Sequence, residues 1–155
     1  MTLPVTPTPT QLFAAARANI LVQHDDLRER LHGAMATARA AGRGDATARA
    51  DLSPVIVLII GALGNHMGYE ESVLFPVLRG KGDAGRAQMA AIQADHKRQR
   101  AEFATLLELA REGDPDALAL VLQSFVADVL IDMDSEEGLL ARERFPETPP
   151  ATPSL

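Results

Sequence analysis

The chain contains no cysteine and no tryptophan, and only one of its 155 residues is a tyrosine. Without cysteine it can form neither a disulfide nor a thiolate metal site, and it has no cysteine nucleophile. The scarcity of aromatic residues, together with an abundance of alanine and leucine, disfavours a β-sandwich and favours helices. A chain of this length can form one domain with a substantial core.

Basic residues are also sparse, since the formal net charge is −6 and the basic cluster at residues 97–100 stands alone. A surface that binds nucleic acid needs clustered lysine and arginine, so we expect no nucleic-acid partner. The longest apolar run, residues 55–63, is too short to span a bilayer. No basic segment followed by an apolar one marks a signal peptide, so we expect no membrane partner and a cytoplasmic location.

Proline and threonine are concentrated in residues 1–9 and 146–155, which we interpret as extended tails around one domain, residues 10–145. Within that domain, apolar residues recur at steps of three and four in four stretches, which predicts four amphipathic helices. Turns rich in glycine and aspartate separate them, at residues 42–45, 80–83 and 113–115. Two starts for the second helix stay open, one at Asp45 and one at Ser53-Pro54. Long helices joined by short turns predict an all-α, up-down-up-down four-helix bundle.

Residues equally distant from a turn lie at the same height in an antiparallel bundle. Lys81 lies midway between His66 and His96, and Asp114 lies midway between His96 and Asp132. Asp45 is likewise midway between His24 and His66. All of these histidines, and Asp132, fall on the inward stripes of their helices, which on the second helix also include Val73 and on the third Leu107 and either Gln99 or Arg100. We therefore predict that His24, His66, His96 and Asp132 form one layer in the interior.

Glu70 and Glu136 follow His66 and Asp132 by one helical turn on the same faces. The layer thus collects three carboxylates in an apolar interior, where an unpaired charge costs several kcal/mol. A cation would neutralise them, and nitrogen and oxygen donors without sulfur suit iron, manganese or zinc. The sequence predicts a metal site, with two ions matching the ligand count best, whose ligands are His24, His66, Glu70, His96, Asp132 and Glu136.

Other polar residues have simpler interpretations. Arg100 lies one turn from His96, and a metal-free scaffold in which it pairs with the inward carboxylates is the alternative to a metal site. Glu71 and Glu137 lie beside the stripes, where a place on the helix flank is favoured over bridging a metal. His32, near a helix end, is interpreted as solvated.

The pattern resembles the hemerythrin superfamily, the HHE cation-binding domain, over nearly all of residues 10–145. That family has a histidine on its first helix, which corresponds to His24, and a His-x3-Glu on its second, which corresponds to His66 and Glu70. His96 corresponds to a third-helix histidine, and Asp132 with Glu136 to the family's fourth-helix histidine and carboxylate. Oxygen-carrying members have a second histidine where this chain has Arg100, and a histidine where it has Asp132.

The resemblance implies a non-haem iron protein, with two iron ions in the oxygen carriers. The leading hypothesis is a protein that binds or senses dioxygen, peroxide, nitric oxide or iron itself through this site. An oxidase or peroxidase that uses the same centre is an alternative. Carboxylate ligands are harder than imidazole and favour ferric iron, which argues against reversible oxygen carriage.

Overall fold

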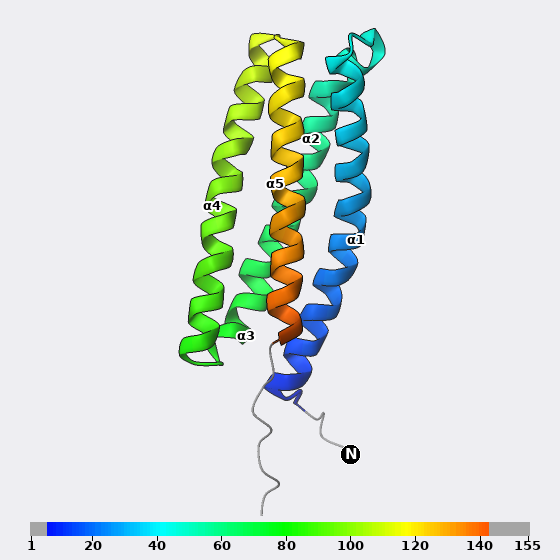
Figure 1. Ribbon diagram of the computed structural model, residues 1–155. Helices are drawn as coiled ribbons and strands as arrows, with labels where there is room; N and C mark the ends of the chain where they lie inside the picture. Colours follow the sequence, from blue (N-terminus) through cyan, green and yellow to red (C-terminus); the bar gives the residue numbers. More distant parts are fainter. Residues whose placement is uncertain (1–5, 143–155) are drawn as a thin grey trace, which may run out of the picture.

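A computed structural model describes residues 6–142 as an antiparallel four-helix bundle, as the sequence predicts. The helices are α1 (Pro9–Gly42), α2 (Ala46–Tyr69), α4 (Asp83–Glu112) and α5 (Pro115–Arg142). A π-helical segment, η1 (Glu70–Leu74), and the short helix α3 (Phe75–Arg79) continue α2. The α1–α2 and α4–α5 turns lie at one end of the bundle and the α3–α4 turn at the other (Figure 1). Residues 146–155, interpreted from the sequence as a tail, lie outside the described residues.

Local capping signals set the helix ends. The Thr8 side chain accepts a hydrogen bond from the backbone N–H of Gln11, and the Gln11 side-chain oxygen accepts one from the backbone N–H of Thr8, so a capping box begins α1. Asp45 caps α2 by accepting from the N–H of Ala48, which leaves Pro54 exposed inside the helix. Of the two starts that the sequence left open, the structure therefore has Asp45. Gly44, Gly82 and Gly113 adopt positive φ in the three turns.

A polar layer divides the apolar core into two clusters. The larger cluster lies toward the α1–α2 turn and the smaller toward the α3–α4 turn. Along α1, Ile20 belongs to the smaller cluster, His24 to the polar layer and Leu27 to the larger cluster. The same order holds on α4, where His96 lies between Ile92 and Phe103. Apolar packing on both sides thus isolates the layer from water.

The π-helical segment begins at Glu70 and was not predicted. A π-turn adds a residue to the helical repeat, and such turns occur often at functional sites. The segment rotates the chain after Glu70, so Val73, expected on the inward stripe, is 39% exposed, whereas Leu74 and Phe75 are buried. On α4, Leu107 is likewise exposed and Leu106 is buried in its place, because the stripe steps three residues after Phe103.

One helical stretch, Ala46–Arg79, is long and apolar enough to cross a membrane by length and composition. Core helices of bundles pass the same test. Its inward face carries the buried His66 and Glu70 and packs against the other helices. The absence of a membrane partner stays a prediction of the sequence.

The backbone of α4 at Gly85 lies very close to the backbone of α3 at Leu78, and this contact gives a prediction for the stability of the fold. A Cβ atom at Gly85 would collide with the backbone carbonyl of Leu78, whereas one at Gly64 would meet no atom within 4 Å. We expect Gly85→Ala to lower the free energy of unfolding by about 1–3 kcal/mol, since the backbone must shift. Gly64→Ala is the control and should raise it by up to about 1 kcal/mol, because alanine favours a helix. Urea denaturation measures both, and equal stability of the two variants would contradict the packing.

Candidate metal centre

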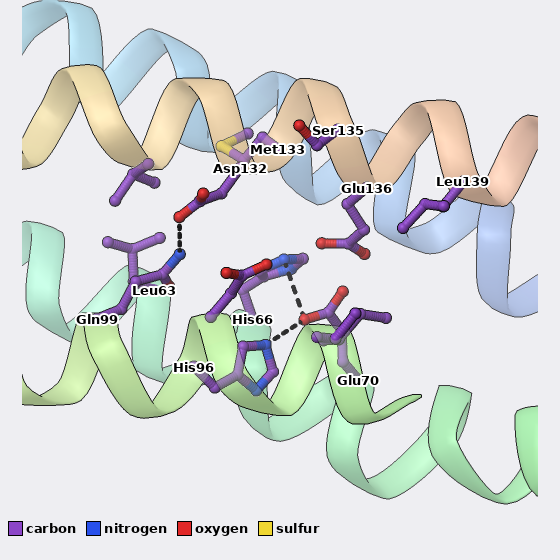
Figure 2. A pocket seen from close by; sticks show the side chains of 14 residues that line it. Leu63, His66, Glu70, His96, Gln99, Asp132, Met133, Ser135, Glu136 and Leu139 are labelled. Atoms are coloured by element: carbon purple, nitrogen blue, oxygen red, sulfur yellow. Dashed lines mark hydrogen bonds and ion pairs between the residues drawn. The ribbon is translucent and has the colours of Figure 1, made fainter. Parts of the chain in front are cut away.

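Four side chains from four segments of the bundle converge on one point in its interior. His24 (α1), His66 (α2), Glu70 (η1) and Glu136 (α5) each offer a donor atom, and these atoms all lie within 4.8 Å of one another. Figure 2 shows the carboxylates of Glu70 and Glu136 turned toward each other, with His66 and His96 alongside. His24 and Glu70 are fully buried, and the Glu136 side chain is 13% exposed.

The Nε2 atoms of the three histidines all face this point. The Nε2 atoms of His24 and His66 lie 3.2 Å apart, and His66 Nε2 lies 3.5 Å from Glu70 Oε2. The Nε2 atom of His96 lies 2.8 Å from that same oxygen, so His96 joins the group through Glu70. The structure thus brings together five of the six ligands predicted from the sequence.

The Nδ1 atoms of the same histidines face outward to acceptors. His24 donates to Glu137 at 2.8 Å, His66 to the Gln23 side-chain oxygen at 2.9 Å and His96 to Glu71 at 2.9 Å. A neutral imidazole carries one N–H, so a proton held at Nδ1 turns the Nε2 lone pair into the site. Two lone pairs 3.2 Å apart repel unless a cation or an added proton lies between them. This arrangement is the one that metal-ligating histidines adopt in proteins.

The two outer carboxylates are themselves held by arginines. Glu137 pairs with Arg28 at 2.8 Å, and Glu71 pairs with Arg100 at 2.7 Å. Partial burial alone would raise the pKa of Glu71, but the hydrogen bonds from His96 and Arg100 lower it below its ordinary value. Partial burial would likewise raise the pKa of Glu137, but its hydrogen bonds with Arg28 and His24 lower that pKa below its ordinary value. Both carboxylates therefore stay ionised and keep the Nδ1 protons in place.

These outer acceptors were not predicted as such. Glu71 and Glu137 were placed on the helix flank, and the repeated Glu-Glu pairs at residues 70–71 and 136–137 are the signal that could have identified them. In each pair the first carboxylate faces the interior and the second receives an imidazole N–H from another helix. Gln23 offered no signal beyond its place before His24.

The interior carboxyls lack neutralising partners. Within residues 6–142, the ion pairs of Glu70 and Glu136 are with histidines, and the Oε1 atom of each is buried without a hydrogen bond. Burial, followed by the hydrogen bond to Glu70, raises the pKa of Glu136 to about 9, and burial also raises the pKa of Glu70. Burial, followed by the charges of His24 and His96, lowers the pKa of His66 to about 3. Only a cation lets these groups take the charge states of metal ligands.

Asp132 lies apart from the group of four. Its carboxylate accepts hydrogen bonds from Arg98 and, at 3.0 Å, from Gln99, and its side chain is 19% exposed. Gln99 is the residue that faces inward, which settles the choice left open between Gln99 and Arg100. Arg100 is 52% exposed and pairs with Glu71. The metal-free alternative requires Arg100 to neutralise the inward carboxylates, and in this structure Arg100 does not do so. His32 is exposed, as expected.

A cavity of about 50 Å³ adjoins the site between α4 and α5. Its walls include the ligand-type side chains Glu70, His96, Asp132 and Glu136 and several apolar ones, Leu63, Ile92, Val129, Met133 and Leu139. Because about 10–15 Å³ of accessible space is enough for one water molecule, the cavity has room for a ligand of a few atoms. The donor set of imidazole and carboxylate, the inward lone pairs and the unpartnered Oε1 atoms together fit an iron, manganese or zinc ion.

A comparison with family models gives one match, to the hemerythrin HHE cation binding domain, over residues 16–143. No curated protein and no solved structure matches the chain. The match spans every helix that contributes to the site.

The pKa shifts predict how the stability of the metal-free protein depends on pH. Between 4.5 and about 9, folded Glu136 holds a proton that the unfolded chain has released, so the free energy of unfolding falls as pH rises. His66 acts oppositely from about 3 to 6.5, where only the unfolded chain is protonated. The effects of Glu136 and His66 oppose each other up to pH 6.5, so a net decline appears above that pH, to which Glu136 contributes at most about 1.4 kcal/mol per pH unit.

Urea unfolding of chelator-treated protein at several pH values above 6.5 measures this decline. Glu136→Gln should flatten it, because the glutamine has no proton to lose, and Glu108→Gln, on the exposed face of α4, should not. A decline of equal steepness in both variants would contradict the burial of the Glu136 carboxyl.

Proposed function

This chain belongs to the hemerythrin HHE cation-binding domain family, and from that premise we propose that it is a non-haem iron protein that binds or senses a small ligand. The ligand is dioxygen, peroxide, nitric oxide or iron itself, and the site can hold up to two iron ions. One observation carries the proposal: three imidazole Nε2 atoms and two buried carboxyls face one point, while every Nδ1 proton is held from outside.

His24, His66, Glu70 and Glu136 would hold the first ion, since their donor atoms already lie within 4.8 Å of one another. His96, in contact with Glu70, and Asp132, across the cavity, would serve a second ion. Bound iron would supply redox chemistry toward a small oxygen- or nitrogen-containing ligand. Iron suits this donor set because carboxylates are hard ligands that stabilise its ferric state.

The residues around the ions determine what they can do. Arg28 and Arg100 keep Glu137 and Glu71 ionised, and these hold the protons of His24 and His96 at Nδ1. The two apolar clusters on either side keep bulk water from the layer. A ligand that enters the adjoining cavity would meet carboxyl and imidazole groups at one wall and apolar side chains at the others.

The size of the cavity bears on the oxidase or peroxidase alternative. A cavity of about 50 Å³ suits dioxygen, peroxide or nitric oxide better than a larger organic substrate. An enzyme at this site would therefore oxidise ferrous iron or reduce peroxide. Turnover separates the two functions, because a catalyst consumes many equivalents of oxidant per site and a binding protein stops after one.

Metal uptake tests the proposal directly. We expect anaerobic protein to take up about two equivalents of ferrous iron at saturation, as di-iron carboxylate bundles do. In air it should then develop near-ultraviolet bands of ferric iron bound to oxygen. Iron at a hundredfold excess over its dissociation constant should raise the free energy of unfolding by about 2.7 kcal/mol, because only the folded state binds it. The double variant His66→Ala, Glu70→Ala should lose both effects.

His32→Ala is the matched control, because His32 is an exposed histidine on the same helix as His24. It should bind iron as the unaltered protein does. Iron uptake by the double variant equal to that of the control would overturn the proposed function.

The outer carboxylates give a separate prediction about affinity. Glu71→Gln and Glu137→Gln should each weaken metal binding about tenfold to a hundredfold, because a neutral amide holds the Nδ1 proton less firmly. Competition with a chelator of known affinity measures the change. Glu108→Gln, which removes a carboxylate that pairs with Arg111 on the surface, should leave affinity unchanged. Equal affinity in all variants would show that these carboxylates do not support the ligands.

A further inference from the structure

Asp132 lies on the wall of the cavity that adjoins the site, yet its hydrogen bonds lead elsewhere. Arg98 and Gln99, neighbours on α4, both donate to the same oxygen, Oδ2. The other oxygen, Oδ1, accepts no hydrogen bond from residues 6–142. Figure 2 shows Gln99 reaching across the cavity to Asp132, at a distance from the facing pair Glu70 and Glu136. The carboxylate is thus attached to α4 by one edge only.

Arg98, which pairs with Asp132, also lies close to two other carboxylates on its own helix. Arg98 also contacts Asp95 at 3.1 Å, one turn earlier on α4, and the charge of Glu102, one turn later, raises the pKa of the guanidinium after the larger contribution of Asp132. The Arg98 side chain is 46% exposed. Release of Asp132 would therefore leave Arg98 in water beside acidic neighbours rather than unpaired.

The same cavity is lined by two carboxyl oxygens that have no hydrogen-bond partner within residues 6–142. Glu70 is fully buried, and its Oε1 atom has no hydrogen-bond partner in the part of the chain that the structure describes. The Oε1 atom of Glu136 is also buried and also has no such partner. Both residues line the cavity together with His96 and Asp132. A cation in the cavity would be within reach of side chains from η1, α4 and α5, and it would satisfy oxygens that nothing in residues 6–142 satisfies now.

We propose that Arg98 and Gln99 form a latch on Asp132, which must open before the cavity accepts a second cation. The inference rests on the proposed function, because it concerns the order in which that site fills. The group of His24, His66, Glu70 and Glu136 fills first, since its atoms are already gathered. The second position fills later and more weakly, because the cation competes with Arg98 and Gln99 for Asp132.

Cobalt(II) titration of the full chain tests the latch, with equilibrium dialysis giving the number of ions and visible absorption reporting each step. We expect two steps of unequal affinity in the unaltered protein. Arg98→Ala and Gln99→Met should each strengthen the second step about fivefold and leave the first unchanged, in line with the strength of a partly exposed ion pair. Asp132→Asn should weaken the second step about tenfold or more, because an amide is a poor replacement for a carboxylate ligand.

Two comparisons distinguish the latch from a simple effect of charge. Gln99→Met removes a hydrogen-bond donor without altering net charge, so strengthening by Arg98→Ala alone would overturn the latch. Arg111→Ala removes a surface arginine of α4 paired with Glu108 and should change neither step. A single bound equivalent in every variant, or a second step indifferent to Asp132→Asn, would also overturn it. Absence of the first step, or its survival in His66→Ala, would instead refute the proposed function.

Discussion

The interior of this bundle is governed by one electrostatic constraint: carboxyl groups that lie in an apolar core must be neutralised there. Glu70 and Glu136 sit between two apolar clusters, and within residues 6–142 neither is paired with a lysine or an arginine. Burial raises the pKa of both carboxyls, to about 9 for Glu136, so that without a cation Glu136 holds a proton near neutral pH while His66 remains neutral. A bound cation would take the place of that proton, so metal binding and the stability of the bundle would depend on the same groups.

Charge is arranged in order from the surface to the interior. Arg28 and Arg100 lie outermost, Glu137 and Glu71 next, and His24 and His96 innermost. Each contact connects two different helices, so the orientation of each imidazole depends on the packing of the whole bundle. The acidic residues of the sequence thus have two roles that composition cannot distinguish: Glu71 and Glu137 orient imidazole rings, whereas Glu70 and Glu136 face the site.

Two departures from the oxygen-carrying members of the family meet in one part of the structure. Arg100, at the position of their second third-helix histidine, points outward to Glu71. Asp132, at the position of their fourth-helix histidine, is held by Arg98 and Gln99. Both residues lie on α4 or contact it, whereas His24, His66 and Glu70 lie on α1, α2 and η1, at positions that correspond to the family pattern. The two differences from the oxygen carriers thus lie on the α4–α5 side of the site.

The sequence by itself determined the bundle and most of the polar layer. Apolar periodicity and short turns are local signals, and counting from the turns brought His24, His66 and His96 to one height because antiparallel helices rise equally per residue. The tertiary structure decided the rest. Neighbouring side chains on a helix point about 100° apart, so the rotation of α4 about its axis decides that Gln99, and not Arg100, faces the interior. The π-turn at Glu70 likewise places Val73 on the outside. Asp132 could face the other site residues or pair with Arg98. Which of these occurs depends on how α4 packs against α5, and no local sequence pattern encodes that packing.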